Sequence, residues 1–290
     1  MKRIIIVILI LFVIFAGSTT SGSAANRLNV ITSSKEIYTN AYINSSDDSL
    51  LINQWYNNSS LIMKWVKQNV TVKQIQGVYG TISPDGHYYT YTKNNMLYLF
   101  EENDRLINKF PWDIRLYPTM AWSWDSKFIY YSIGENYNTI YRIDANKGIR
   151  EKISNDIYFN PVTVQDGNIL FLLKDKDPNA VMSPSEVVKY NLTTKKAQII
   201  KLPEIKDRYI HEDFTISPDG KILVFQNNGA GIYVINIQTQ KIIDQFDIFD
   251  IPGNNVVSSF SWKSDGSYLI FSSSSPSQGY RLYKYFPPSN

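Results

Sequence analysis

A short turn motif recurs along the chain, and its spacing limits the fold more than any other feature of the sequence. The clearest copies are Ser83-Pro84-Asp85-Gly86 and Ser217-Pro218-Asp219-Gly220. The aspartates that align in these turns are separated by 37, 40, 41, 53 and 46 residues; they are Asp48, Asp85, Asp125, Asp166, Asp219 and Asp265. A repeat of roughly 40 to 50 residues made of short strands is typical of a β-propeller, a ring of similar sheets around a central channel.

Each turn is followed by apolar segments with the composition of strands. After Asp219 they are Ile222–Phe225, Ile232–Ile235 and Lys241–Ile243. Runs rich in β-branched and aromatic residues between polar turns indicate strands. With the strand that precedes each turn, they make four strands per repeat. We therefore predict an all-β fold, a six-bladed β-propeller of four-stranded blades.

The turn residues have local roles that explain their recurrence. Proline fixes φ at the first central position of a tight turn, aspartate accepts hydrogen bonds from its own backbone, and glycine adopts positive φ. We interpret the repeated aspartate as a lock on the hairpin rather than as a ligand.

The last repeat has no fourth strand at the C-terminal end of the chain. Its third strand is Leu282–Tyr285, and only five residues follow. A strand-like segment, Leu28–Thr32, precedes the first repeat. We predict that residues 27–33 complete the last blade and close the ring, which leaves only short, protected edges.

These repeats resemble the PD40 repeats of TolB-like β-propellers, which are related to the propellers of prolyl oligopeptidase-type proteins. The family pattern runs Trp-Ser-Pro-Asp-Gly, an apolar run, then Ile-Tyr-x-x-Asp. The match is good at 83–86 and 217–220, but Trp124 replaces proline in the third copy and 165–167 lacks the Ser-Pro pair. The resemblance implies a propeller domain alone, so neither the partner role of TolB nor peptidase activity is expected to transfer.

The first 25 residues have the pattern of a secretory signal peptide. Lys2-Arg3 precede the apolar run Ile4–Phe15, and small residues follow up to Ala25. We expect cleavage after Ala24 or Ala25, with an uncleaved membrane anchor as the alternative, and a single propeller domain over 26–290. The protein is then an exported bacterial protein, periplasmic or extracellular and cell-surface.

Composition limits the partners and the covalent chemistry. The chain has no cysteine, which excludes a diacylglyceryl lipoprotein anchor and disulfides. Removal of Lys2 and Arg3 lowers the formal net charge from +3 to +1. Such a balance argues against nucleic acid as a partner, because phosphate binding needs a clustered basic face.

Few residues indicate catalysis or metal binding. The two histidines are His87, beside a turn and expected at the surface, and His211, which shares a strand face with Asp213. Two such ligands fall short of a metal site, so no metal or other cofactor is expected. The chain has no Gly-x-Ser-x-Gly nucleophile elbow. Paired carboxylates for glycoside hydrolysis remain possible at Asp47-Asp48, Glu101-Glu102 and Glu212-Asp213.

The tryptophans and one long loop are further candidates for contacts. Trp122 and Trp262 occupy the position before the turn that favours core packing, whereas Trp55 and Trp112 are expected in loops and exposed. The insertion Lys174–Ser185 is the longest between predicted strands, and it is open to a functional or a neutral interpretation.

Aligning the strands that precede the turns predicts a binding site at one mouth of the channel. One parity carries apolar residues such as Phe214, Ile216 and Trp262, which should face between blades. The opposite parity carries smaller polar residues, and we place those furthest from the turns at the channel mouth: Tyr79, Thr119, His211, Asp213 and Ser259.

The function that follows is an exported, non-catalytic binding module for a protein, peptide or envelope polymer. The alternative is a hydrolase or lyase acting on a carbohydrate or peptide at the channel mouth. We expect a monomer, with membrane association only where the signal segment is retained.

Overall fold

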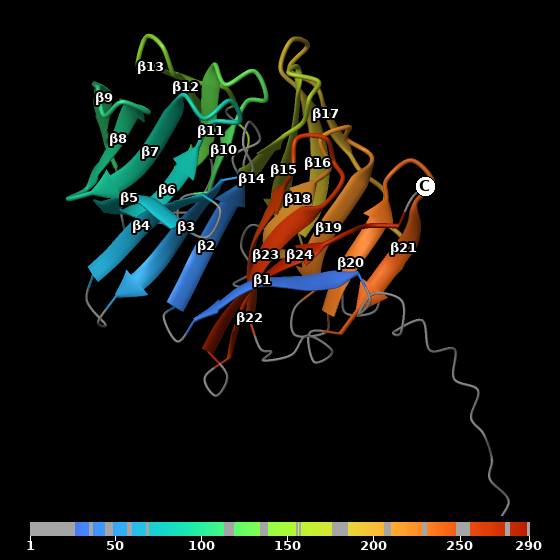
Figure 1. The fold of residues 1–290 in the computed structure, drawn as a ribbon. Coiled ribbons are helices and arrows are strands. Elements are labelled where there is room, and N and C mark those ends of the chain that lie inside the picture. The colour runs from blue at the N-terminus through green and yellow to red at the C-terminus, as the bar shows by residue number, and fades with distance from the viewer. Residues whose placement is uncertain are drawn as a thin grey trace, which may run out of the picture.

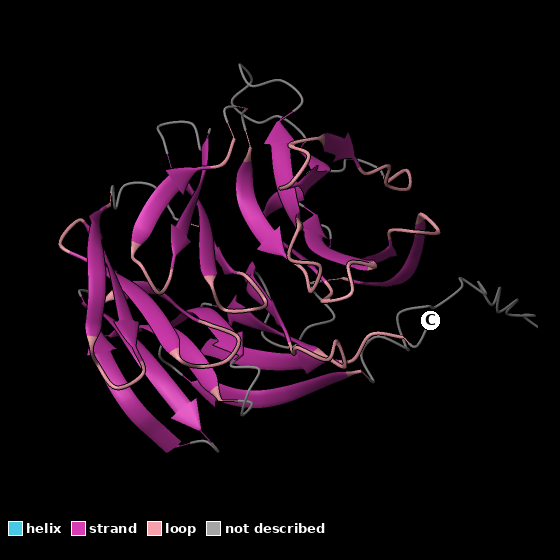
Figure 2. Cartoon of the chain, turned by 90° about the horizontal axis from the view of Figure 1, so that it is seen from above, coloured by secondary structure: helices cyan, strands magenta, loops and turns pink. Residues whose placement is uncertain are grey.

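The computed structural model is built from strands arranged in six four-stranded antiparallel sheets (Figures 1 and 2). It describes residues 27–34, 37–43, 49–56, 60–67, 70–112, 119–133, 139–154, 156, 158–175, 185–205, 210–227, 231–247, 256–275 and 279–288. Within these residues no helix is long and apolar enough to span a membrane. The predicted six-bladed propeller of four-stranded blades is confirmed.

Blades 1 to 5 each consist of four strands that follow one another in the sequence, from the innermost strand to the outermost. Blade 1 contains β2 (Ile37–Ile43), β3 (Leu50–Tyr56), β4 (Ser60–Lys67) and β5 (Val70–Gln76), and blade 2 contains β6 (Val78–Ile82), β7 (Tyr88–Lys93), β8 (Met96–Glu101) and β9 (Leu106–Pro111). Blade 3 contains β10 (Met120–Trp122), β11 (Phe128–Ile133), β12 (Thr139–Asp144) and β13 (Ile149–Lys152), and blade 4 contains β14 (Phe159–Thr163), β15 (Ile169–Asp175), β16 (Ser185–Asn191) and β17 (Ala197–Ile199). Blade 5 contains β18 (Ile210–Ile216), β19 (Ile222–Asn227), β20 (Gly231–Asn236) and β21 (Lys241–Phe246).

Blade 6 joins the two ends of the chain. It contains β22 (Val256–Trp262), β23 (Leu269–Ser275) and β24 (Gly279–Tyr285), and its outermost strand is β1 (Leu28–Ser34) from the N-terminal side. Leu28 pairs with Tyr285 and Ser34 with Tyr280 in an antiparallel register. In Figure 1 the blue β1 crosses beside the red strands of blade 6. The predicted closing strand is therefore confirmed.

A buried ion pair fastens this closing strand to the neighbouring blade. The Nη1 of Arg27 lies 2.9 Å from the Oδ2 of Asp244 on β21. The side chain of Asp244 is only 4% exposed. The hydroxyl of Tyr285 donates to the same oxygen at 2.7 Å. Burial, together with that hydrogen bond to Asp244, raises the pKa of Tyr285 far above its usual value, so the phenol stays a donor. Blades 5 and 6 and the N-terminal segment meet at this one carboxylate.

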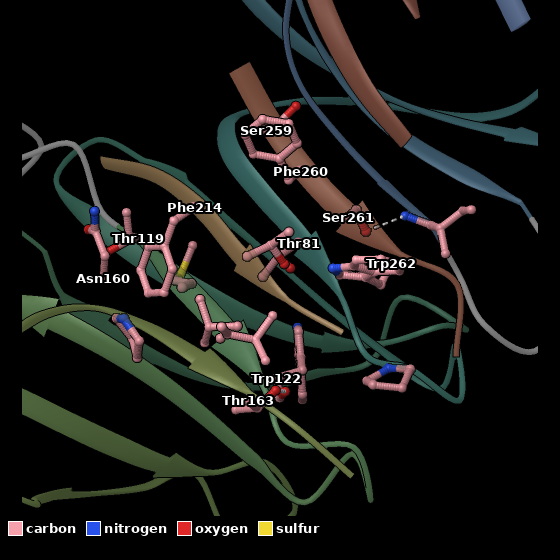
Figure 3. A pocket seen from close by; sticks show the side chains of 18 of the residues that line it. Thr81, Thr119, Trp122, Asn160, Thr163, Phe214, Ser259, Phe260, Ser261 and Trp262 are labelled. Carbon is pink, nitrogen blue, oxygen red and sulfur yellow. Dashed lines mark hydrogen bonds between the residues drawn. The ribbon is translucent and has the colours of Figure 1, made fainter. Parts of the chain in front are cut away.

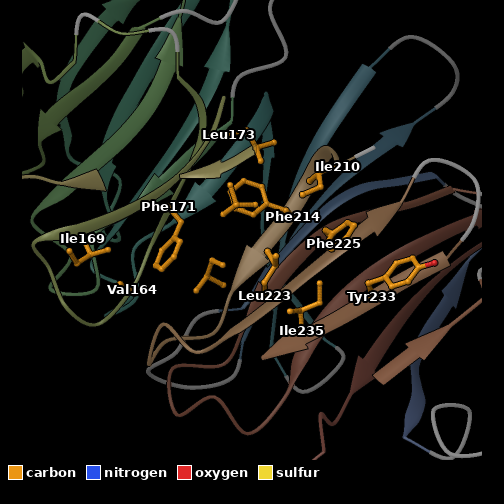
Figure 4. Packing of buried hydrophobic residues seen from close by; sticks show 12 residues of the cluster. Val164, Ile169, Phe171, Leu173, Ile210, Phe214, Leu223, Phe225, Tyr233 and Ile235 are labelled. Atoms are coloured by element: carbon orange, nitrogen blue, oxygen red, sulfur yellow. The ribbon is translucent and has the colours of Figure 1, made fainter. Parts of the chain in front are cut away.

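The hydrophobic core is divided into six clusters, one between each pair of neighbouring blades. Figure 4 shows the cluster between blades 4 and 5, where Phe171 lies near Phe214 and Leu223. Ile222 and Val224, which alternate with Leu223 along β19, belong to the next cluster, between blades 5 and 6. Both faces of the sheet are thus buried, which explains why the strands are continuous apolar runs rather than alternating ones.

The turn residues lock the hairpins as predicted. In blade 5 the hydroxyl of Ser217 donates to Asp219 Oδ1 at 2.6 Å, and that oxygen also accepts the Lys221 N–H at 3.1 Å. Gly86, Gly220 and Gly266 have φ between 72° and 77°. The turn of blade 4 differs, because Gly167 is not among the residues with positive φ. The first copy, around Asp48, lies outside the described residues.

Deletion of residues 27–33 is expected to lower the melting temperature by many degrees or to cause aggregation. The deletion removes β1, leaves β24 as an unpaired edge, and leaves Asp244 buried without its cation. Thermal melts of the full chain and of the deletion variant, followed by circular dichroism, measure the effect. Identical melting of the two proteins would contradict closure by this strand.

Candidate functional site

The centre of the ring contains a cavity of about 220 Å³ that the innermost strands of all six blades line (Figure 3). Its walls come from β2, β6, β10, β14, β18 and β22. The side chains of Trp124 and Pro84, which sit in the aspartate turns, form its turn end. Every described residue of the lining is uncharged, and the polar ones are Thr81, Thr119, Asn160, Thr163, Thr215, Ser259 and Ser261.

A backbone bulge recurs at the same height in the inner strands. Tyr79, Asn160 and Ser259 each lie six residues before their turn aspartate, and each has a positive φ of 50° to 53°. Beside them the strand register shifts, so that Val78 and Thr81 pair with Thr92 and Thr90. A bulge inserts one unpaired residue and interrupts the simple alternation of side chains. Sequence parity therefore holds only between the bulge and the turn.

The bulge of blade 2 is held by a buried asparagine from blade 1. Asn53 on β3 donates from Nδ2 to the Gly80 carbonyl at 3.1 Å, and its Oδ1 accepts the Gly80 N–H at 3.0 Å. Because these two bonds satisfy both backbone groups of Gly80, the inner strand can depart from regular pairing without leaving buried polar groups unpaired.

The residues predicted for the channel mouth have different locations. Thr119 and Ser259 line the central cavity. Tyr79 occupies the same bulge position as Ser259, but its larger side chain packs against the apolar cluster between blades 2 and 3. His211 and Asp213 lie on β18, but their side chains lie outside the described part of the structure. A role of these five residues in ligand binding stays a prediction.

Hydroxyl pairs repeat in blades 3 and 6. The hydroxyls of Thr119 and Ser132 are 3.2 Å apart, and those of Ser259 and Ser272 are 3.4 Å apart. Both pairs are separated by 13 residues and occupy the same position relative to the turn. They keep the hydroxyls of the inner strands oriented at the level of the bulge.

Side chains from neighbouring blades cap the backbone edges that face the cavity. Ser261 Oγ of blade 6 accepts the Ile43 N–H of blade 1 at 3.1 Å. The hydroxyl of Thr163 in blade 4 donates to the Trp122 carbonyl in blade 3. These bonds join blade 6 to blade 1 and blade 4 to blade 3, and they use backbone groups that an added strand would need.

The apolar parity is confirmed. Met120, Trp122, Phe214, Ile216 and Trp262 are all at most 9% exposed and belong to clusters between blades. The expectation for Trp112 is wrong. The Trp112 side chain is 4% exposed and packs on Tyr131 between blades 2 and 3, with ring centroids 5.0 Å apart. Trp55 lies within β3 rather than in a loop, and its side chain lies outside the described part of the structure.

Sequence reasoning missed the contribution of blade 4 and of the third turn. Asn160 and Thr163 line the cavity, yet the degenerate Gln165-Asp166-Gly167 turn gave no reason to align this strand. Counting back from Asp166 would have placed Asn160 level with Thr119 and Ser259. Trp124 was noted only as a departure from proline, whereas in the structure its ring lines the cavity.

Among the remaining candidates for chemistry, His87 and the pair Glu101-Glu102 do not line the cavity. The side chain of His87 is 67% exposed, as expected, and lies 3.7 Å from Glu102. Among the described residues no three His, Asp or Glu side chains are grouped so as to bind a metal ion. Most of the insertion Lys174–Ser185, like Asp47 and Asp48, lies outside the described residues.

The turn carboxylates lie close to the cavity along the chain, as do Asp213 and Lys263, the neighbours of the lining residues Phe214 and Trp262. Partial burial opposes ionisation of Asp219, but hydrogen bonds from Ser217 and Lys221 outweigh it and hold its pKa below the usual value. Asp125 is in the same balance with Ser123 and Lys127. These aspartates accept hydrogen bonds within their own turns. At neutral pH they are carboxylates that pair with lysines 3.0 Å away.

Replacement Asp219→Asn is expected to destabilise the protein at neutral pH and to have little effect in acid. Since folding lowers the pKa of Asp219, its ionised form stabilises the fold above the unfolded value of about 3.9, and this contribution is lost as the pH falls through the folded pKa. Melting temperatures at about pH 7 and about pH 3 measure it, with the exposed Glu204→Gln as the control. An equal deficit at both pH values would contradict this role.

The protein is a six-bladed β-propeller with a closed ring and a central cavity whose described lining carries no charged side chain. No model of a known protein family matches the sequence, and no curated protein matches it. The function is therefore argued from the geometry of the cavity.

Proposed function

We propose that this protein is a non-catalytic β-propeller binding module whose ligand occupies the central cavity. The observation that carries the proposal is the composition of the cavity wall. Hydroxyl, amide and aromatic side chains converge on it from five of the six blades, and no described lining residue is charged. Binding sites are typically concave and mostly apolar, with a few placed polar groups that orient the ligand.

The same wall favours binding over hydrolysis or elimination. A hydrolase or lyase needs a positioned acid or base within hydrogen-bond reach of its substrate. The described lining provides the hydroxyls of threonine and serine, and the nearby turn aspartates are held by their own backbone and by lysines. Hydroxyls of this kind recognise polar groups well but need a neighbouring base to become nucleophiles.

The resemblance of the turns to PD40 repeats supports a TolB-like propeller of the cell envelope. The Lys2-Arg3 start and the apolar run after it support export, with residues 1–25 acting as a signal peptide. An exported propeller without cysteine depends on packing for its stability, as the six apolar clusters between blades allow. The partner we propose is a protein, peptide or polymer of the envelope.

Export predicts that the mature protein begins at Ala25 or Asn26. Expression of the full chain with its own N-terminus, followed by fractionation and N-terminal sequencing of the exported material, tests this. Intact Met1 on exported protein would show that the N-terminal segment is not cleaved, and it would favour a retained membrane anchor. Material confined to the cytoplasm would contradict export.

Filling the cavity with Ala121→Phe is expected to abolish ligand capture while leaving thermal stability almost unchanged. Ala121 lines the cavity and is half-buried, so a larger ring there takes up the space of a ligand. The measurement is retention of solubilised envelope protein and of envelope polysaccharide, assayed separately, on the immobilised full chain. The matched control is Ala197→Phe, on the exposed face of the outer strand β17.

Capture that is at least tenfold weaker in Ala121→Phe than in both the parent and the control would support the central site. Equal capture by all three proteins, with melting temperatures within a few degrees, would move the binding site away from the channel to the outer loops.

A further inference from the structure

Three tryptophans of the cavity wall have buried indole N–H groups without a hydrogen-bond partner. They are Trp122, Trp124 and Trp262, and all three line the central cavity. Trp122 and Trp262 are only 5% and 6% exposed. Outside the cavity lining, the indole of Trp65 donates to Ser49 Oγ at 2.8 Å, whereas that of Trp112, between blades 2 and 3, is also buried without a partner. A buried donor without an acceptor costs free energy, so its recurrence around one cavity requires an explanation.

The two most buried of these donors lie on opposite sides of the ring. Trp122 ends β10 of blade 3 and Trp262 ends β22 of blade 6, and three blade positions separate them in a ring of six. Figure 3 shows both rings on the wall, with hydroxyls and Phe214 and Phe260 around the same space. A ligand in the middle of the cavity would therefore lie between tryptophan donors on two opposite sides.

The chemistry of this wall limits the ligand. An indole N–H only donates, so the ligand must present acceptors. Serine and threonine hydroxyls both donate and accept, which suits a ligand with hydroxyls of its own. The flat faces of tryptophan and phenylalanine suit a ligand with an apolar face. Because the described lining is uncharged, burying a carboxylate, phosphate or ammonium there would leave that charge unpaired.

We propose that the central cavity binds one uncharged saccharide unit, with the indole N–H groups of Trp122 and Trp262 donating to its oxygens. A sugar ring combines hydroxyls around its rim with apolar C–H faces, which is the combination that this wall complements. This inference rests on the proposed binding function and specifies its ligand as a neutral sugar unit of an envelope polymer.

The size and the edges of the cavity support one sugar unit over an added peptide strand. Its volume of about 220 Å³ is below the roughly 300–1,000 Å³ of pockets for drug-sized ligands, so it holds one small unit. Peptides that add to a sheet bind through free backbone groups of an edge strand. Here Ile43 N–H, the Trp122 carbonyl and both backbone groups of Gly80 already bond to side chains of neighbouring blades.

The test titrates the full chain with neutral sugars and compares three matched variants. The probes are glucose, N-acetylglucosamine and their short neutral oligomers, with galacturonic acid and a mixed tripeptide library as comparators. Binding is measured by calorimetry and by the shifts of the indole N–H resonances in nitrogen-15 NMR spectra. The variants are Trp122→Phe, Trp262→Phe and Trp112→Phe. Trp112 is the matched control, because its indole is equally buried and unpartnered but lies between blades 2 and 3, outside the cavity lining.

We expect a neutral sugar to bind and to shift the resonances of Trp122 and Trp262 but not that of Trp112. Loss of one hydrogen bond should weaken binding about threefold to tenfold in each cavity variant, and Trp112→Phe should bind like the parent. The resonance shifts use the unaltered chain, so they decide the question even where a variant folds poorly.

Binding of neutral sugars with equal affinity in all three variants, or without shifts of the cavity indoles, would overturn the assigned donors. Binding of galacturonic acid or peptides in preference to neutral sugars would overturn the ligand class. Should no neutral sugar bind at millimolar concentration while Ala121→Phe still abolishes capture from the envelope, the saccharide inference fails and the binding function stands. Failure of both experiments would overturn the binding function as well.

Discussion

Packing between blades is the interaction on which the rest of this structure depends. Each sheet buries both faces, so no blade is stable until it has a neighbour on each side, and the set is complete only as a closed ring. Full burial of one large apolar side chain contributes about 1.5–3 kcal/mol, more than the roughly 0.5–1.5 kcal/mol of one turn hydrogen bond. The six clusters therefore provide most of the stability, and the turns mainly direct each chain reversal. Closure of the ring is correspondingly the critical step, and the chain achieves it with β1, β24 and the pair of Arg27 with Asp244.

The central cavity is a consequence of the same geometry. Six inner strands converge, and the side chains near the axis must be small or must turn aside between blades. Threonine and serine side chains line the cavity, while Trp122 and Trp262 pack mainly into the clusters between blades, with their indole N–H groups buried at the cavity wall. The result is a pocket built mainly from the inner strands, closed at one end by Pro84 and Trp124 of the turns, with no charged side chain in its described lining. Such a site recognises neutral polar groups and pays little conformational entropy for doing so, because the inner strands are already ordered by their neighbours.

Much of the fold was predictable because its determinants are local. The aspartate turns, the apolar runs and the closing strand all lie in short segments. The strands and the closing strand were confirmed, as were the turns at Asp85, Asp125, Asp219 and Asp265, whereas the turn of blade 4 differs and the first copy lies outside the described residues. The site was predictable in part. Thr119 and Ser259 reach the cavity as expected. Tyr79 has the same position relative to its turn and the same bulge as Ser259, but its aromatic ring packs against the apolar cluster between blades 2 and 3. Trp112 was misplaced for a related reason, because nothing local indicates that the segment after β9 returns to the core.

The number of blades could be predicted from the amino-acid sequence alone. So could the strands in each blade, most of the turns between them and the segment that closes the ring. These features follow from hydrogen bonds and backbone preferences within a few residues. Three features are seen only in the folded protein. They are the set of side chains that share the cavity, the contact of Asn53 with the bulge of another blade, and the meeting of Arg27 with Asp244 and Tyr285. The residues of that last contact are up to about 260 positions apart along the chain. Their encounter depends on the order of the blades, the register of each strand and the twist of each sheet together, and no short segment of sequence encodes that combination.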